Sequence, residues 1–245
     1  MVKKSLIVLI ALLSVVPVTI AQTTVVPKEE TPVQSTETGK WAVGIDIAGS
    51  LNIPAVGTAY MKSLSYGSFI GGSYGVNVRY NPYRWLSFRV GAQRVAKNYS
   101  VTRTLPGEDG ETPTYGSLIY NTFWDVPVWA DLSIGRKVRW HLFLGAYVGF
   151  WSKSSVKGTA LPLSTVDLDL SFNESYTFDN TRDNRFDAGL NYGLGLSIPC
   201  SQHFGIDVEA LWYYGLTDLQ KPYMRELNPM YNTTILLQVG ANYRF

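Results

Sequence analysis

Ionisable and amide side chains recur at alternate positions inside the apolar stretches of this chain. They are Asp46, Asn77, Arg79, Arg89, Asp125, Asp131, Asp187, Asp207, Glu209 and Arg244. Charges that leave bulk water must pair with opposite charges or keep some water. These side chains could therefore form an internal network in which Arg79, Arg89 and Arg244 pair with the carboxylates, or they could line a path for ions or protons. We expect the paired network.

Residues suited to enzymatic chemistry are scarce. Histidine is the common general base, and the two histidines, His141 and His203, each begin an apolar stretch after a short turn. A carboxylate-only site could use the acids of the segment 152–184, which are Asp167, Asp169, Glu174, Asp179 and Asp183. These acids lack the spacing and glycine of a calcium loop, and the chain has neither a Cys/His cluster for zinc nor a phosphate-binding glycine loop. We expect no catalytic residue, metal or cofactor, and the ligand-binding residues are unknown.

The stretch from Arg185 to Leu216 indicates which elements position the polar side chains. Apolar residues alternate with glycine and with polar residues such as Asp187 and Glu209, on both sides of a short turn at Pro199. A period of two predicts strands, because successive side chains point to opposite faces. Glycine weakens a soluble sheet, but in a narrow barrel it makes room for large or charged side chains opposite. The polar face is therefore predicted to line a lumen.

Eight such strands are predicted, at residues 41–51, 68–80, 85–99, 119–132, 140–151, 185–198, 204–216 and 233–245. The strand 140–151 is apolar on both faces, and continuity with its neighbours places Leu142 and Phe150 outward. Strands of about 9 to 11 residues with one apolar face are typical of outer-membrane barrels. The predicted fold is all-β, an eight-stranded antiparallel up-and-down transmembrane β-barrel whose interior is just wide enough for side chains.

The connections between these strands alternate in length, beginning with a long one. Outer-membrane barrels have long external loops and short periplasmic turns, so both chain ends and both histidines are predicted on the periplasmic side. Alternating residues at 166–172 predict a hairpin above the membrane. Aromatic belts are expected at both interfaces. Their members are Trp41, Tyr80, Trp85, Trp140, Phe204 and Tyr243 at the periplasmic ends, and Tyr120, Phe150, Phe186 and Tyr214 at the outer ends.

The first forty residues differ from the rest in composition. Residues 1–21 combine Lys3 and Lys4 with a short apolar run and a small residue at the end, which predicts a secretory signal peptide, with a membrane anchor as the alternative. Residues 22–40 are rich in Thr, Pro, Glu and Ser and predict a disordered periplasmic tail. Residues 41–245 are assigned to the barrel. No later segment has the roughly 18 consecutive apolar residues of a transmembrane helix.

The composition argues against a nucleic-acid partner and against an internal disulfide. Of the 245 residues, 16% are charged and 13% are aromatic, with a net charge of +2. This near balance gives no basic field for nucleic acid. Cys200 is the single cysteine, so no internal disulfide can form. We expect a monomer whose partners are outer-membrane lipids and, through its loops or periplasmic rim, envelope or secretion-machinery proteins.

Three sequence blocks carry a family resemblance. They are residues 124–128 (WDVPV), residues 186–190 (FDAGL) with Gly193 and Gly195 following, and residues 209–218 (EALWYYGLTD). With the C-terminal strand they resemble the PorT-like outer-membrane β-barrels, although Asp125 stands where Glu is expected. The resemblance implies an eight-stranded barrel, and the namesake of that family is implicated in type IX secretion of surface proteins.

The sequence therefore favours a non-enzymatic integral outer-membrane barrel associated with secretion or envelope organisation. Two alternatives from other classes remain. A secreted, soluble, lipocalin-like barrel would turn its apolar faces inward around a ligand. An outer-membrane enzyme could act on lipid or peptide at its rim, using the loop carboxylates.

Overall fold

The structure, a computed structural model, describes residues 40–56, 64–104, 114–135, 138–159, 171–221 and 229–245. The predicted signal peptide, the predicted tail up to residue 39 and most of the alternating stretch 166–172 lie outside these residues. Within the described part, no helix has the length and apolar character needed to cross a membrane.

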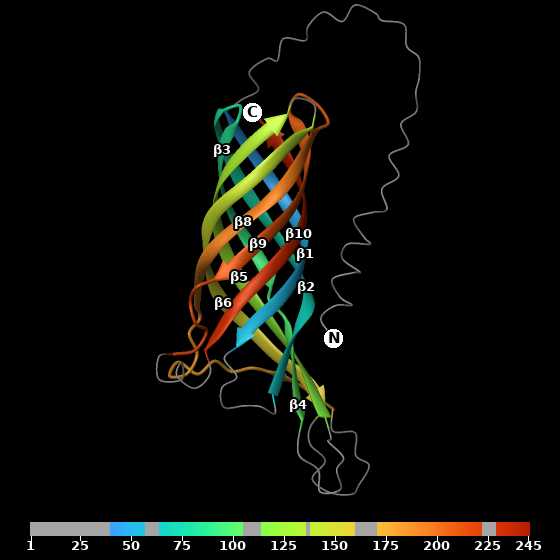
Figure 1. Cartoon of the computed structure of the whole chain (residues 1–245), viewed down its shortest axis with the longest axis vertical. Helices are drawn as coiled ribbons and strands as arrows, with labels where there is room; N and C mark the ends of the chain where they lie inside the picture. Colours follow the sequence, from blue (N-terminus) through green and yellow to red (C-terminus); the bar gives the residue numbers. More distant parts are fainter. Residues whose placement is uncertain (1–39, 57–63, 105–113, 136–137, 160–170, 222–228) are drawn as a thin grey trace, which may run out of the picture. The chain divides into compact units, whose positions relative to one another are not determined.

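Ten strands are described. They are β1 (Trp41–Val56), β2 (Leu64–Tyr83), β3 (Leu86–Ala96), β4 (Tyr99–Thr104), β5 (Thr114–Gly135), β6 (Arg139–Thr159), β7 (Ser171–Ser175), β8 (Phe186–Pro199), β9 (Phe204–Gly215) and β10 (Met230–Arg244). Eight of them close a ring in the order β1, β2, β3, β5, β6, β8, β9, β10, because β1 pairs with both β2 and β10 (Figure 1). Every pairing in the ring is antiparallel, so the predicted eight-stranded barrel is confirmed.

Apolar side chains cover the outer wall of the ring. Along β9 the side chain of Val208 is 45% exposed while that of Glu209 is 3% exposed, and the same alternation runs along the other seven strands. On β6, which is apolar on both faces, Leu142 points outward and Phe143 inward, as continuity with its neighbours predicts. A lipocalin-like barrel needs the opposite facing, so that alternative is wrong.

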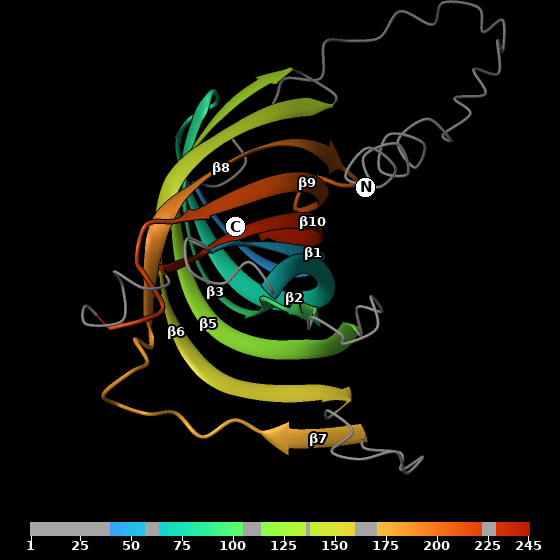
Figure 2. The same ribbon diagram turned by 60° about the horizontal axis from the view of Figure 1, so that its bottom comes forward.

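The wall continues beyond the ring at one end. β4 pairs with both β2 and β5, and β7 pairs with the outer part of β6 (Figure 2). The segment between the predicted strands 85–99 and 119–132 is polar and was not predicted as strand, but its residues 101–104 and 114–118 belong to β4 and β5. Backbone hydrogen bonding satisfies a strand whatever the polarity of its side chains, so polar composition alone did not reveal the extension.

A two-residue interruption of the strand separates β3 from β4, while β2 and β5 continue past it on either side. Lys97 and Asn98 lie between the two strands and both are buried, as is Tyr99 after them. The Lys97 N–H donates to the Asn121 carbonyl (3.0 Å), and the Asn98 amide donates to the Ile70 carbonyl (3.0 Å). The predicted strand 85–99 is thus interrupted near its end, where Lys97 and Tyr99 lie inside the barrel and the buried Asn98 lines the outer wall.

The two ends of the barrel differ. Short connections after β2, β5 and β8, together with Trp41 and Arg244, mark what we name the turn end. The longer connections mark the opposite, loop end (Figure 1). At the last position of β5, Gly135 has a φ of 126°, a conformation that side-chain-bearing residues rarely adopt.

Candidate functional site

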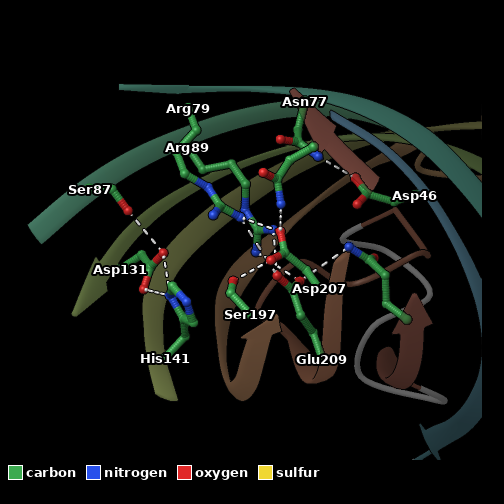
Figure 3. A network of polar contacts seen from close by, with 12 residues as sticks. Asp46, Asn77, Arg79, Ser87, Arg89, Asp131, His141, Ser197, Asp207 and Glu209 are labelled. Carbon is green, nitrogen blue, oxygen red and sulfur yellow. Dashed lines mark hydrogen bonds and ion pairs between the residues drawn. The ribbon is translucent and has the colours of Figure 1, made fainter. Parts of the chain in front are cut away.

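The centre of the lumen holds two arginine–carboxylate pairs. Arg89 on β3 donates to both carboxylate oxygens of Glu209 on β9, at 2.8 and 3.0 Å. Arg79 on β2 donates to Asp207 at 2.9 Å and lies 3.9 Å from Glu209 (Figure 3). All four side chains are at most 6% exposed. These pairs tie β2 and β3 to the opposite wall, which backbone pairing does not join directly.

Further polar contacts surround this network. The Asn77 amide donates to Asp46 at 2.6 Å, and Asn242 donates to Asp207 at 2.9 Å. The Nδ1 atom of His141 lies 2.7 Å from a carboxylate oxygen of Asp131 (Figure 3). Ser87 donates to the same carboxylate at 2.9 Å.

A second ionic centre lies toward the loop end. The Lys97 ammonium is 2.8 Å from Asp187 and 3.0 Å from Asp125, and none of the three side chains has measurable exposure. The Tyr147 hydroxyl donates to Asp187 at 3.3 Å, and Asn232 donates to it at 3.2 Å. Lys97 also lies 4.7 Å from the centre of the Tyr147 ring. We name this group of residues the lysine centre.

Aromatic rings fill the lumen between the two ionic centres. The cluster comprises Val95, Trp129, Phe143, Tyr147, Tyr213, Leu211 and Leu236. The Arg89 guanidinium lies 4.6 Å from the Phe143 ring centre, an attractive cation–π geometry. The Tyr213 hydroxyl donates to Gln93 at 3.0 Å. Ion pairs and rings therefore follow one another along the lumen.

The loop end of the lumen is covered by a second apolar cluster, which consists of Tyr99, Phe123, Trp151, Leu219 and Met230. A cavity of about 220 Å³ lies against it. Beside this cavity the Tyr176 hydroxyl donates to Asp183 at 3.0 Å, and Arg182 also contacts that hydroxyl. Burial, and then the hydrogen bond to Asp183, raise the pKa of Tyr176 to about 12. Leu219 and Met230 lie between the predicted strands 204–216 and 233–245, so the sequence did not indicate this cover.

Nine of the ten candidate residues are buried in the lumen, and Arg244 is half-buried at the turn end. Among the described residues Arg244 makes no ion pair, so its predicted carboxylate partner is wrong; Arg79 already occupies the nearest acid, Asp207. The sequence analysis missed Lys97, which lies in the interruption between β3 and β4. It placed His141 at the start of a strand but did not predict its contact with Asp131.

Among the residues that the structure describes, the candidate side chains do not come together as a recognisable catalytic group. His141 is held inside the turn end, while His203 is exposed there and stacks on Tyr243. Of the predicted loop acids, Asp167 and Asp169 lie outside the described residues, and Asp179 accepts hydrogen bonds from Thr181, which lower its pKa. No group of three metal-binding side chains occurs in the described part of the chain.

A closed ring with an apolar exterior and an ionic interior defines a transmembrane β-barrel, because closure satisfies every backbone group away from water. A family model for the outer membrane protein beta-barrel domain matches residues 30–221. The chain belongs to this family and is an outer-membrane protein.

Three solved structures illustrate the comparison. Neisserial surface protein A is 14% identical over 86% of this chain and 100% of its own, with a TM-score of 0.46. OprG from Pseudomonas aeruginosa is 10% identical over 86% and 98%, with a TM-score of 0.49. The outer membrane protease OmpT from Escherichia coli is 8% identical over 84% and 96%, with a TM-score of 0.46. No curated protein sequence matches this chain.

Proposed function

We propose that the protein is a non-enzymatic outer-membrane barrel that acts through its rims and outer wall rather than by passing solutes through its lumen. The observation that supports this proposal is the succession of buried groups along the lumen. The Asp131–His141 contact, the arginine pairs, the aromatic cluster, the lysine centre and the cover of Leu219 and Met230 follow one another. A lumen packed in this way offers no continuous water path.

We further propose that the turn end and both chain ends face the periplasm, and that the loops face outward. The contrast between short and long connections supports this orientation. The closed ring leaves no free strand edge in the barrel wall, which supports a monomer. The PorT-like sequence blocks support a role in protein secretion or envelope organisation, with a periplasmic or surface protein as the partner.

Two measurements test this proposal. Full-length protein folded into planar bilayers should give no stepwise conductance, with a known porin as the positive control. Crosslinking in intact envelopes, followed by affinity capture, should recover secretion or envelope proteins bound at a rim. Stepwise conductance that depends on the folded barrel would contradict the closed lumen. Recovery of the barrel without any crosslinked protein would contradict the partner role.

Orientation is tested separately. A cysteine introduced at Ser201, in the turn after β8, should resist a membrane-impermeant thiol reagent in intact cells, in a Cys200→Ser background. A cysteine at Thr181, beside the cover of the lumen, should react. The reverse pattern would invert the proposed orientation.

A further inference from the structure

A basic groove runs along the outer wall at the loop end. It crosses β3, β5 and β6, has a volume of about 310 Å³, and its lining includes Arg94, Tyr120, Thr122, Lys153 and Lys157. Three of its lining side chains are cations and none is a carboxylate. The groove is therefore a concentrated positive site on the outer wall.

Contacts within the groove hold two of its cations in place. Arg94 donates to the Thr122 hydroxyl at 3.2 Å, and its guanidinium lies 5.7 Å from the ring centre of Tyr74. The Lys157 ammonium lies 5.3 Å from the ring centre of Tyr120. Cation–π contacts position these groups without neutralising them, so they keep their charge for a ligand.

An irregularity in β6 turns the lysines toward the outer wall. The pairing register shifts between Thr122 and Phe123, so that Phe123 pairs with Trp151 and Thr122 with Lys153. The extra residue, Ser152, lets Trp151 point into the lumen while Lys153 points outward. Side chains two apart share a face, so Lys157 is also on the outer wall.

The groove begins where the apolar band ends. Trp124 and Phe150 pair directly and are 48% and 50% exposed. Exposed aromatic side chains mark the membrane interface. Thr122 and Lys153 form the next outward-facing pair along the same two strands, so the cations lie at the level of lipid headgroups.

Among the described residues, no neighbouring strand supplies an acid to this site. Glu174 on β7 pairs with Val156 and so shares its face, which is opposite to that of Lys153 and Lys157. Asp125 and Asp187 belong to the lysine centre inside the barrel. Within the part of the chain that the structure describes, the three cations of the groove therefore have no carboxylate partner.

We propose that this groove binds the anionic, phosphate-bearing headgroup of a membrane lipid, one whose phosphate charge is not balanced by a cation in the same headgroup. Arg94, Lys153 and Lys157 contact the phosphate, and the exposed Trp124 and Phe150 pack against the attached acyl chains. The inference rests on the membrane location and deepens the expected lipid partnership by naming one site and one headgroup chemistry. It does not depend on which end of the barrel faces outward.

Native mass spectrometry of the full chain, folded in neutral detergent, tests the site. Phosphatidic acid is the probe and phosphatidylcholine with the same acyl chains is the comparison. We expect one phosphatidic acid to be retained in preference to phosphatidylcholine. The double variant Lys153→Gln/Lys157→Gln should bind it about thirty-fold more weakly, from about 1 kcal/mol for each cation removed.

Matched variants separate a site from general charge attraction. Lys40→Gln/Arg84→Gln removes two cations at the turn end and should bind as tightly as the parent chain. Lys153→Arg/Lys157→Arg keeps the charge and should retain the lipid, which also shows that changes at these positions permit folding. Equal loss in the turn-end variant, or full retention in Lys153→Gln/Lys157→Gln, would overturn the proposal.

Inorganic phosphate distinguishes a lipid from a free anion. It should displace the lipid only at concentrations far above those at which the lipid binds, because it lacks acyl chains. Equal affinity for inorganic phosphate would overturn the lipid assignment. If the parent chain shows no preference for phosphatidic acid and still gives no conductance, this inference is rejected and the proposed function is unaffected.

Discussion

Lys97 is enclosed by two carboxylates and two aromatic rings, with its ammonium 2.8 and 3.0 Å from Asp187 and Asp125. Moving ions out of water is costly, and mutual attraction offsets this cost only while all partners are present. Asp187 is also bound by Tyr147 and Asn232. Removing the lysine would therefore leave two buried negative charges close together.

We predict that Lys97→Met lowers the free energy of unfolding by about 3 to 5 kcal/mol. Urea unfolding in lipid vesicles, followed by tryptophan fluorescence, measures this change. Combining Lys97→Met with Asp125→Asn and Asp187→Asn should restore part of the loss, because the uncompensated charges are gone. Lys157→Met, an exposed lysine at the same end, should change stability by no more than about 0.5 kcal/mol. A similar loss in both single variants would argue against the lysine centre.

The contact between Tyr176 and Asp183 at the loop end should depend on pH. The pKa of Tyr176 is raised to about 12, first by burial and then by the hydrogen bond to Asp183. The unfolded value is about 10, so the contact stabilises fully below about pH 10 and is lost as the pH rises through about 12. Ultraviolet difference titration of the parent chain against Tyr176→Phe isolates this phenol. Asp183→Asn should lower its pKa; an unchanged titration would contradict the contact.

At this scale, alternation predicted the inward facing of residues such as Asp46 and Glu209 but not which atoms would meet. Pairings such as Arg89 with Glu209 join strands far apart in the chain, and no local pattern encodes them. Lys97 was missed because it lies in the interruption between β3 and β4, beyond the part of the strand whose facing the sequence indicated.

Within single strands, glycine marks where the lumen is fullest. A Cβ atom placed on Gly195 of β8 would lie 2.9 Å from the Phe143 ring and 3.0 Å from the Glu209 side chain. A Cβ atom on Gly49 of β1 would meet nothing within 4 Å. The sequence predicted this use of glycine in general, and the contacts identify the positions that need it.

We therefore predict that Gly195→Val costs roughly 1 to 3 kcal/mol of stability, because it overpacks the lumen. Gly49→Val, the matched control, should be neutral or slightly stabilising, because valine favours strands. Both values come from the urea midpoint in the same vesicles. Equal effects at the two glycines would show that space in the lumen is not limiting.

The outward face of β8 gives a prediction of the opposite kind. Leu194 is 60% exposed near the middle of the strand, where its neighbour is lipid. Leu194→Arg should cost roughly 2 to 4 kcal/mol, whereas Leu194→Met should be nearly neutral. Unfolding in vesicles measures both. A neutral arginine would mean that this face does not meet hydrocarbon.

Strand existence was predicted well and strand ends poorly. All eight ring strands were predicted, since each has a long series of apolar residues at alternate positions. The predicted ends were less accurate: β5, for example, begins at Thr114 rather than at residue 119. Beyond the membrane a strand no longer needs an apolar face. The alternation that identifies it therefore stops before the backbone pairing does.

The barrel as a whole has an apolar band of limited height. On β6 the band runs from Trp140 to Phe150, both exposed. At about 3.3 Å per residue and a tilt of about 40°, this span projects to about 25 Å along the membrane normal. The band therefore matches a thin hydrocarbon layer.

We predict that the free energy of unfolding is largest in vesicles whose hydrocarbon thickness is about 25 Å and falls in thicker ones. Saturated phosphatidylcholines of increasing chain length, compared in their fluid phases, provide the series. A steady rise in stability with thickness would mean that the exposed aromatic residues do not mark the interfaces.

The three sequence blocks that resemble the PorT-like barrels meet at the lysine centre. Asp125 comes from the first block and Asp187 from the second, while Thr217 from the third donates to Asp187 at 3.2 Å. The residues that carry the resemblance thus hold the strands of the barrel together from inside the lumen. Chains that carry the same three blocks are therefore expected to share these buried ionic contacts, whatever their individual functions. Differences in function are instead expected to lie in the rims of the barrel and in the basic groove.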